Sequence, residues 1–190
     1  LYMEAERMKQ VEQNAELLYN SFLQGDNSAF ETLVQSYRYS LMLFINRYVQ
    51  DLHTAEDLAE DVFVRLLVKR PRYKGSEASF KTWLYTAGRN LAVDYLRKHS
   101  RVVVVEELPD EQLCSLEEQV LKTERERALY RAIAVLPEEQ QRLIYLLYIE
   151  GLGYDHAAKV LGKSKSRLYG LARQAKEQIK TVLEKEGFEL

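Results

Sequence analysis

Apolar side chains recur every three or four positions through most of this chain, and few segments alternate apolar and polar residues. Spacing of this kind is typical of helices that bury one face. The longest stripe begins after Ala29 and continues for about five turns. It comprises Phe30, Leu33, Val34, Tyr37, Leu41, Phe44, Ile45 and Tyr48. With three prolines and eight glycines in 190 residues, the pattern predicts an all-α protein.

Other helices are predicted on both sides of this stripe. One covers 14–23 and ends at a turn, 25–28, whose side chains can cap the helix that follows. Thr54, with Asp57 three residues later, comes close to a capping box. We therefore expect Thr54 to be the N-cap of the next helix.

A loop ending at Ser79, which can act as a cap, precedes an aromatic-rich helix that extends to about Lys98. Such a helix can stack aromatic rings on unpaired bases while its cations follow the nucleic-acid backbone. The alternative is that Trp83 belongs to the core, and that Asn90 and Asp94 only hydrogen-bond one another. Composition leaves both interpretations open.

The second half of the chain has the spacing of a helix-turn-helix. Pro137 stands where a helix can start, and 151–153 breaks the chain with two glycines. A short helix at 154–161 is followed by Gly162, which permits the turn because glycine adopts positive φ cheaply. Ser164 can then cap the last helix. The apolar face of this last helix is Leu168, Leu171, Ala172, Ala175 and Ile179.

Charge is unevenly distributed, although the formal net charge is only -2. Residues 69–101 contain nine Lys or Arg and two acids, and residues 159–180 contain seven Lys or Arg and one acid. The segment between them, 102–123, contains six acids. Because local clusters of Lys and Arg attract polyanions, this layout indicates two nucleic-acid-binding segments joined by an acidic connector.

We therefore expect two small helical domains, 14–101 and 117–184, joined by an acidic linker at 102–116. A hydrophobic content of 46% and a charged content of 29% are ordinary for a globular protein. The single cysteine, Cys114, fits a reducing compartment. No apolar stretch approaches the roughly 20 residues of a membrane span, and the charged start does not resemble a signal peptide. We expect a cytoplasmic protein without membrane insertion.

Catalytic and metal chemistry find little support in the sequence. The histidines, His53, His99 and His156, have no carboxylate or thiol at metal-ligand spacing. No nucleophile–base pair, phosphate-binding loop or carboxylate constellation is found. We expect neither a metal, nor a cofactor, nor an enzymatic activity.

The polar face of the last predicted helix carries most of the functional signal. A capped helix with such a face can enter a major groove and place its basic flank on phosphates. The alternative is a corner between two helices with a solvated lysine face. The small alanines, the glycine turn, the cap and the local positive charge favour DNA binding.

Three segments, in order, carry a resemblance to a known family. The segment 55–66, Ala-Glu-Asp-Leu-Ala-Glu-Asp-Val-Phe-Val-Arg-Leu, resembles the acidic helix by which bacterial sigma factors dock on RNA polymerase. Phe80-x-x-Trp83-Leu84, with Asn90, Asp94 and Arg97-Lys98 downstream, resembles the promoter-melting and -10-reading segment of the extracytoplasmic-function (ECF) group. The segment 136–151 and the helix-turn-helix resemble the -35-reading domain of that group.

The resemblance implies a sigma factor that binds core RNA polymerase, recognises -10 and -35 promoter elements and promotes DNA opening. Asp57, Glu60, Asp61 and Phe63 would meet the clamp helices of the largest polymerase subunit. The alternative for the acids is a solvated face with partners such as Arg65. The resemblance also implies inhibition by an anti-sigma factor.

The implied DNA contacts fall into two sets. The -10 set is Tyr73, Lys74, Ser76, Ser79, Lys81, Trp83, Arg89, Asn90, Asp94, Arg97, Lys98 and Arg101. The -35 set is Ser164, Lys165, Ser166, Arg167, Tyr169, Arg173, Gln174 and Lys176.

Two departures from the family pattern stand out. Tyr169-Gly170-Leu171 replaces a polar run in the middle of the recognition helix, where Gly170 costs roughly 1 kcal/mol relative to alanine. We expect an unusual -35 preference, or contacts shifted to the flanking cations. Thr86-Ala87-Gly88 is smaller than the usual large aliphatic, and we expect looser packing there.

Two other functions remain open at this point. A two-domain transcriptional regulator with a helix-turn-helix would need no polymerase. A sigma-like module that sequesters an anti-sigma protein would keep the acidic helix and have a damaged DNA surface.

Overall fold

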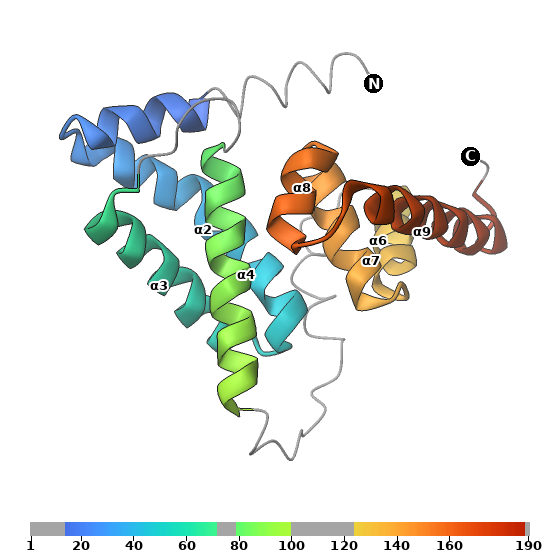
Figure 1. Ribbon diagram of the computed structural model, residues 1–190. Coiled ribbons are helices and arrows are strands. Elements are labelled where there is room, and N and C mark those ends of the chain that lie inside the picture. Colours follow the sequence, from blue (N-terminus) through green and yellow to red (C-terminus); the bar gives the residue numbers. More distant parts are fainter. Residues whose placement is uncertain (1–13, 72–78, 100–123, 189–190) are drawn as a thin grey trace.

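The computed structural model describes residues 14–71, 79–99 and 124–188 (Figure 1). Within these residues all regular structure is helical, which confirms the predicted fold class. The predicted linker lies outside the described residues. So do four of the expected -10 contacts, Tyr73, Lys74, Ser76 and Arg101.

Two groups of helices follow one another along the chain. The first consists of a helix at 14–23, α2 (Asn27–Val49), α3 (Leu52–Lys69) and α4 (Phe80–His99). The second consists of α6 (Glu124–Ala134), α7 (Glu138–Ile144), the π-helical turn η2 (Tyr145–Ile149), α8 (Tyr154–Leu161) and α9 (Lys165–Lys185). In the first group α2 lies against α3 and α4, and in the second α9 lies against α6, α7 and α8 (Figure 1).

Aspartates cap the starts of α2 and α3. Asp26 accepts a hydrogen bond from the backbone N–H of Ser28 at 2.9 Å, within the predicted turn. Asp51 accepts from the backbone N–H of Thr54 at 2.8 Å. The prediction of Thr54 as the N-cap is therefore wrong, because Thr54 is the residue that is capped and α3 begins before it. Hydrogen bonds from the Thr54 side chain and backbone lower the pKa of Asp51 from its ordinary value.

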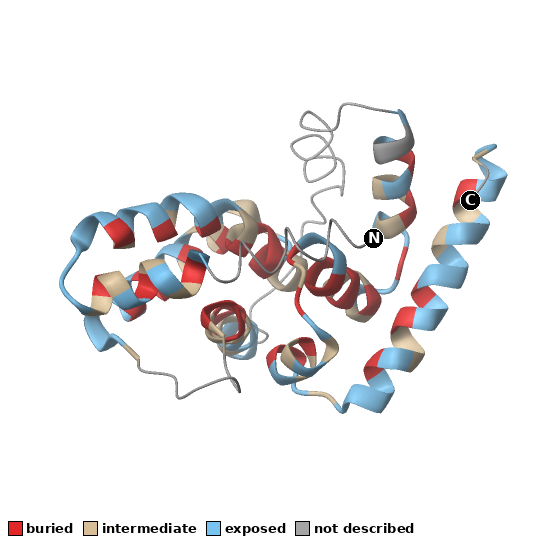
Figure 2. Ribbon diagram, turned by 90° about the horizontal axis from the view of Figure 1, so that it is seen from above, coloured by how far each residue is buried: buried red, intermediate tan, exposed pale blue. Residues whose placement is uncertain are grey.

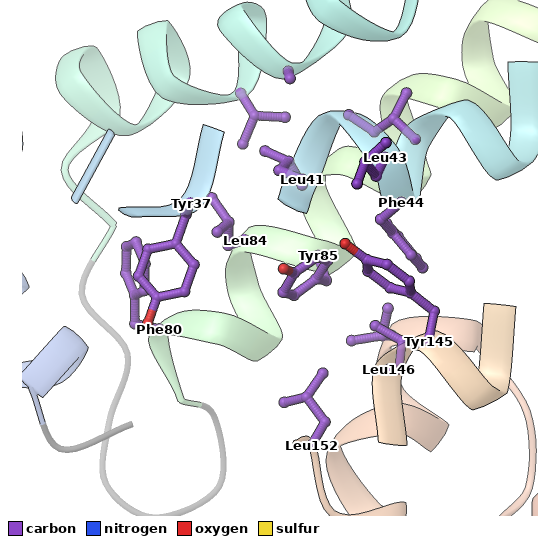
Figure 3. Packing of buried hydrophobic residues seen from close by; sticks show 14 of the residues in the cluster. Tyr37, Leu41, Leu43, Phe44, Phe80, Leu84, Tyr85, Tyr145, Leu146 and Leu152 are labelled. Carbon is purple, nitrogen blue, oxygen red and sulfur yellow. The ribbon is translucent and has the colours of Figure 1, made fainter. Parts of the chain in front are cut away.

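One hydrophobic core runs through both groups of helices. In the second group it includes Tyr145, Leu146 and Leu152, which lie beside Phe44 and Tyr85 of the first group (Figure 3). Two smaller clusters pack α9 against α6 and α7. The buried residues of α9 lie along one side of the helix, as its predicted apolar stripe requires (Figure 2). The first and second groups therefore share buried surface.

Gly88 allows α2 and α4 to approach closely. A Cβ at this position would lie 2.8 Å from Leu41 Cδ1 and 3.3 Å from Ile45 Cδ1. Gly88 is itself buried. The expectation of looser packing at Thr86-Ala87-Gly88 is therefore wrong, because the missing side chain is replaced by neighbouring atoms of α2.

Candidate nucleic-acid interface

The helix-turn-helix is built by α8 and α9. Gly162 ends α8 with φ of 64°, in the left-handed region that glycine adopts cheaply. Ser164 Oγ then accepts a hydrogen bond from the backbone N–H of Arg167 at 3.3 Å and caps α9. Leu168, Ala172 and Ala175 face the core. Both predicted turn residues and the predicted apolar face are therefore confirmed.

The predicted -35 residues lie on the opposite, exposed face of α9 or at its cap. They are Ser164, Lys165, Ser166, Arg167, Tyr169, Arg173, Gln174 and Lys176, all exposed. This face combines four cations with a ring, hydroxyls and an amide. It carries hydrogen-bond donors for the acceptor atoms of base edges and phosphates.

Some of these cations form ion pairs with carboxylates of neighbouring helices. Lys165 Nζ lies 2.9 Å from Asp155 Oδ1, and Arg167 Nη2 lies 3.2 Å from Glu139 Oε2. Glu139 also contacts Lys163, and the bonds from Lys163 and Arg167 lower its pKa. Exposed ion pairs of this kind contribute little and are screened by salt, so a phosphate can replace the carboxylate.

Aromatic rings support the exposed face of α9. Tyr169 stacks on Tyr154 with ring centroids 4.3 Å apart. The Lys176 ammonium lies 5.3 Å from the centre of the Tyr148 ring, and the hydrogen bond that it donates to the Tyr148 hydroxyl raises the pKa of Lys176. Tyr148 and Tyr154 were not among the predicted site residues. No local motif marks either of them, and only the fold brings them beside α9.

The start of α4 is held from two directions. Ser79 Oγ accepts from the backbone N–H of Thr82 at 3.2 Å, which confirms the predicted cap. The backbone N–H of Phe80 donates to Glu16 Oε1, on the helix at 14–23. Tyr19, on the same helix, donates from its hydroxyl to the carbonyl of Pro71 at 2.6 Å. Glu16 and Tyr19 carry no sequence motif and were not predicted.

The described -10 residues do not share one environment. Asn90, Arg97 and Lys98 are exposed, and Arg97 Nη2 lies 2.6 Å from Asp94 Oδ1. Trp83 is half-buried against the core. Ser79, Arg89 and Asp94 are also half-buried.

Lys81 differs from the rest of this set because it is buried. Its Nζ donates to the backbone carbonyl of Glu150 at 2.7 Å. In this arrangement of the chain Lys81 does not reach DNA.

The acidic residues of α3 form an exposed face. Asp57, Glu60 and Asp61 are all exposed, and Arg38 Nη2 lies 2.9 Å from Glu60 Oε1. Phe63 is only 5% exposed and packs in the core, so its ring is covered by other side chains of this protein. The exposed apolar side chains next to this face are Val64, Leu67 and Val68.

The described residues include no group of three or more histidine, cysteine or acidic side chains that could hold a metal ion. Among the helices they form, none has the length and apolar character of a membrane span.

Comparison with known proteins matches both groups of helices. The family model for Sigma-70 region 2 matches residues 33–102, and that for Sigma-70, region 4, matches residues 126–179. The ECF RNA polymerase sigma factor SigM of Bacillus subtilis (strain 168) is 25% identical over 157 residues, covering 80% of this chain and 93% of SigM. The ECF RNA polymerase sigma-E factor of Haemophilus influenzae is 28% identical over 176 residues, covering 84% of this chain and 92% of that protein.

Solved structures share the fold. The structure of CnrH in complex with the cytosolic domain of CnrY has a TM-score of 0.60 at 20% identity, covering 90% of this chain and 97% of that one. The sigma factor RpoE in complex with the anti-sigma factor NepR from Bartonella quintana has a TM-score of 0.60 at 19% identity, covering 82% and 96%. The two family models match in the predicted order, and the ECF relatives are matched along most of their length. This chain therefore belongs to the ECF group of RNA polymerase sigma factors and is a promoter-recognising protein.

Proposed function

We propose that this sigma factor divides its work between two domains, 14–101 and 117–184, with 102–116 as the linker. The first domain contacts polymerase and the -10 element, and the second reads the -35 element. It acts in the cytoplasm, where polymerase and promoter DNA are found, and performs no covalent chemistry itself.

The -35 assignment is supported by the capped, exposed polar face of α9. Ser164 fixes the start of the helix, and the helix is anchored by Leu168 and Ala172. Arg167 and Arg173 then project from a fixed scaffold, which is what base readout in a major groove needs. This face is the single observation that carries the proposal.

Polymerase binding is assigned to the exposed acids of α3, Asp57, Glu60 and Asp61. Their proposed partner is the pair of clamp helices of the largest subunit, where arginines would complement them. Phe63 supports this face from inside the core. The exposed Val64, Leu67 and Val68 provide apolar surface beside the acids. An apolar patch next to complementary charge is typical of a protein–protein interface.

Promoter opening is assigned to α4 and the segment before it. Asn90, Arg97 and Lys98 offer an amide and two cations on the exposed side of α4. Trp83 is half-buried against the core, so part of its ring supports the helix. The proposed -10 contacts of Tyr73, Lys74, Ser76 and Arg101 rest on the family resemblance alone.

An anti-sigma factor is proposed as a further partner. One solved structure that shares this fold, the sigma factor RpoE from Bartonella quintana, is a complex with the anti-sigma factor NepR, as its title states. Binding of such a partner to this chain is tested by capture of the purified protein with a candidate cytosolic domain.

Reconstituted transcription tests the proposal. Purified protein is mixed with core RNA polymerase and genomic fragments, and start sites are mapped on the run-off transcripts. Asp61→Asn is expected to abolish co-purification with core polymerase. Glu31→Gln, which also removes one exposed negative charge from a helix, is the matched control and should bind normally. Normal binding by Asp61→Asn, or wild-type protein that directs no specific transcript, would overturn the assignment.

A further inference from the structure

Two tyrosines from different helices stack on the exposed side of the helix-turn-helix. Tyr154 is the first residue of α8, and its ring centre lies 4.3 Å from that of Tyr169 on α9, with 29° between the ring planes. Tyr169 is 50% exposed, whereas Tyr154 is half-buried. Stacked aromatic rings attract one another beyond the effect of the area that they bury. The stack therefore restricts the Tyr169 ring, although this ring stands at the surface.

Tyr154 is itself held in place. Burial raises the pKa of the Tyr154 hydroxyl, and a hydrogen bond with Tyr148 raises it further, so the ring is a neutral phenol at neutral pH. The Lys176 ammonium of α9 lies 5.3 Å from the centre of the Tyr148 ring. One residue further along α8, Asp155 Oδ1 lies 2.9 Å from Lys165 Nζ of α9. These contacts join the start of α8 to α9 and fix the position of the stack.

Tyr169 lies where a recognition helix faces the bases. It belongs to the second turn of α9, and the N-terminal turns of the second helix contact base edges in a helix-turn-helix. Lys165 and Arg173 stand four residues before and after it, which places them on the same side of the helix. Both are exposed. In a major groove, these two cations can reach phosphates while the ring between them faces the bases.

Gly170 leaves the surface beside the Tyr169 ring open. No atom lies within 4 Å of a Cβ added at this position. A helix residue without a side chain lets another molecule approach the backbone closely. Apolar contacts need such an approach, because a gap of about 0.5–1 Å already forfeits a quarter to a half of their energy. A groove edge can come nearer to α9 here than it could beside a larger residue.

The chemistry of the Tyr169 ring favours one base. In the major groove, guanine is read by bidentate Arg or Lys and adenine by Asn or Gln, whereas thymine offers a C5-methyl group for apolar contact. A phenol ring has no bidentate pair of hydrogen-bonding groups. Its faces and most of its edge are apolar, and half of the Tyr169 surface stays exposed despite the stack. Thymine is therefore the base that this ring can distinguish.

We propose that Tyr169 reads the C5-methyl group of a thymine in the -35 element, and that Tyr154 is the positioning residue that holds the ring for this contact. The inference rests on the proposed function, because it assumes that α9 reads the -35 element. Exposed cations on the same face add sequence-independent affinity through phosphates, while the ring discriminates at one base pair.

Replacing thymine by uracil tests the proposal, because it removes the methyl group and keeps the base pair. The -35 element is first located by footprinting the wild-type holoenzyme on a promoter fragment that it transcribes. Each thymine of this element, on either strand, is then replaced in turn by uracil, and holoenzyme binding is measured by fluorescence anisotropy. At one thymine we expect uracil to weaken binding about fourfold, which is the effect of losing one buried methyl-sized group.

Substitution of the ring should remove this preference. Tyr169→Ala should bind the thymine and uracil fragments equally at that position, because the contact to the methyl group is gone. Arg173→Ala should weaken binding to both fragments and keep their ratio. The matched control is Tyr39→Ala, which removes a ring of similar exposure, 48%, from α2 and should also keep the ratio.

Two substitutions at Tyr154 separate positioning from folding. Tyr154→Leu keeps apolar bulk against the core but removes the aromatic stack, so the ratio of thymine to uracil affinity should fall toward one. Tyr154→Phe keeps the ring, so it should retain the ratio. Both variants should keep the salt dependence of DNA binding, because the phosphate contacts are unchanged. Circular dichroism checks that each variant is folded.

Each result bears on one claim. A -35 element without thymine, equal binding of thymine and uracil at every position, or a preference that survives in Tyr169→Ala would overturn the reading of thymine by Tyr169. The positioning role is wrong if Tyr154→Leu keeps the full ratio or if a folded Tyr154→Phe loses it. Holoenzyme that protects no -35 element, or directs no specific transcript, would refute the proposed function and this inference with it.

Discussion

Gly88 of α4 lies against Leu41 of α2, so closely that a Cβ would sit 2.8 Å from the leucine Cδ1. Both residues are in the core, where the surrounding side chains have little room to move. We predict that Gly88→Ala lowers the free energy of unfolding by about 1–3 kcal/mol, because overpacking outweighs the gain in helix propensity. Urea unfolding followed by circular dichroism measures the change, and an increase in stability would contradict the packing argument.

Gly170 is the natural comparison, because it lies within a helix with no atom within 4 Å of an added Cβ. Alanine there should raise the free energy of unfolding by roughly 0.5–1 kcal/mol, through lower backbone entropy in the unfolded chain. The same unfolding assay checks it. A destabilised Gly170→Ala would mean that α9 needs flexibility at this point.

Asp51 makes the stability of α3 depend on pH. The hydrogen bonds from Thr54 lower its pKa below the ordinary value of 3.8. A group with a lowered pKa in the folded state stabilises fully above its unfolded pKa, and this contribution is lost as pH falls through the folded value. Wild-type protein should therefore lose stability below about pH 4 more steeply than Asp51→Asn. Thermal unfolding from pH 6 to pH 3 tests this, and parallel curves would exclude the contribution.

Substitutions at Phe63 and Asp61 should have different effects, one on folding and the other on polymerase binding. Phe63→Ala removes a buried ring and is expected to cost about 3–5 kcal/mol. Asp61 is exposed, so Asp61→Ala should leave stability within about 0.5 kcal/mol while abolishing capture by core polymerase. A well-folded Phe63→Ala that loses only polymerase binding would show that the ring leaves the core to meet its partner.

Arg173 should contribute directly to DNA binding by α9. It is exposed on the polar face of the helix. Arg173→Ala should weaken binding of the holoenzyme to a -35 duplex and, if the contact is to phosphate, reduce the slope of log affinity against log salt by about 1. Lys185→Ala, at the far end of the same helix, is the matched control. Equal effects of the two substitutions would indicate only a general charge effect.

Local features could be read from the sequence because short-range chemistry decides them. Gly162, Ser164 and Ser79 have the predicted turn and cap roles, and 154–161 is helical over the predicted range. The error at Thr54 has the same origin, since Asp51 offers a competing cap three residues earlier.

Long-range contacts could not be predicted in the same way. Lys81 reads as a surface cation, and only the fold brings Glu150, distant in the chain, to meet it. Phe63 follows two acids and reads as part of their surface, but the helical turn directs it inward. Gly88 reads as a packing defect until Leu41 is placed against it. In each case the deciding neighbour lies on another helix.

The hydrogen bond from Phe80 to Glu16 has a practical consequence for anyone who shortens this protein. A fragment that starts at α2 would retain the matched family region yet leave the first turn of α4 without that acceptor, and Pro71 without its tyrosine donor. Such a fragment is expected to fray at the start of α4, so DNA affinities measured on it would underestimate the contribution of this helix. Studies of the isolated amino-terminal domain should therefore begin no later than residue 14.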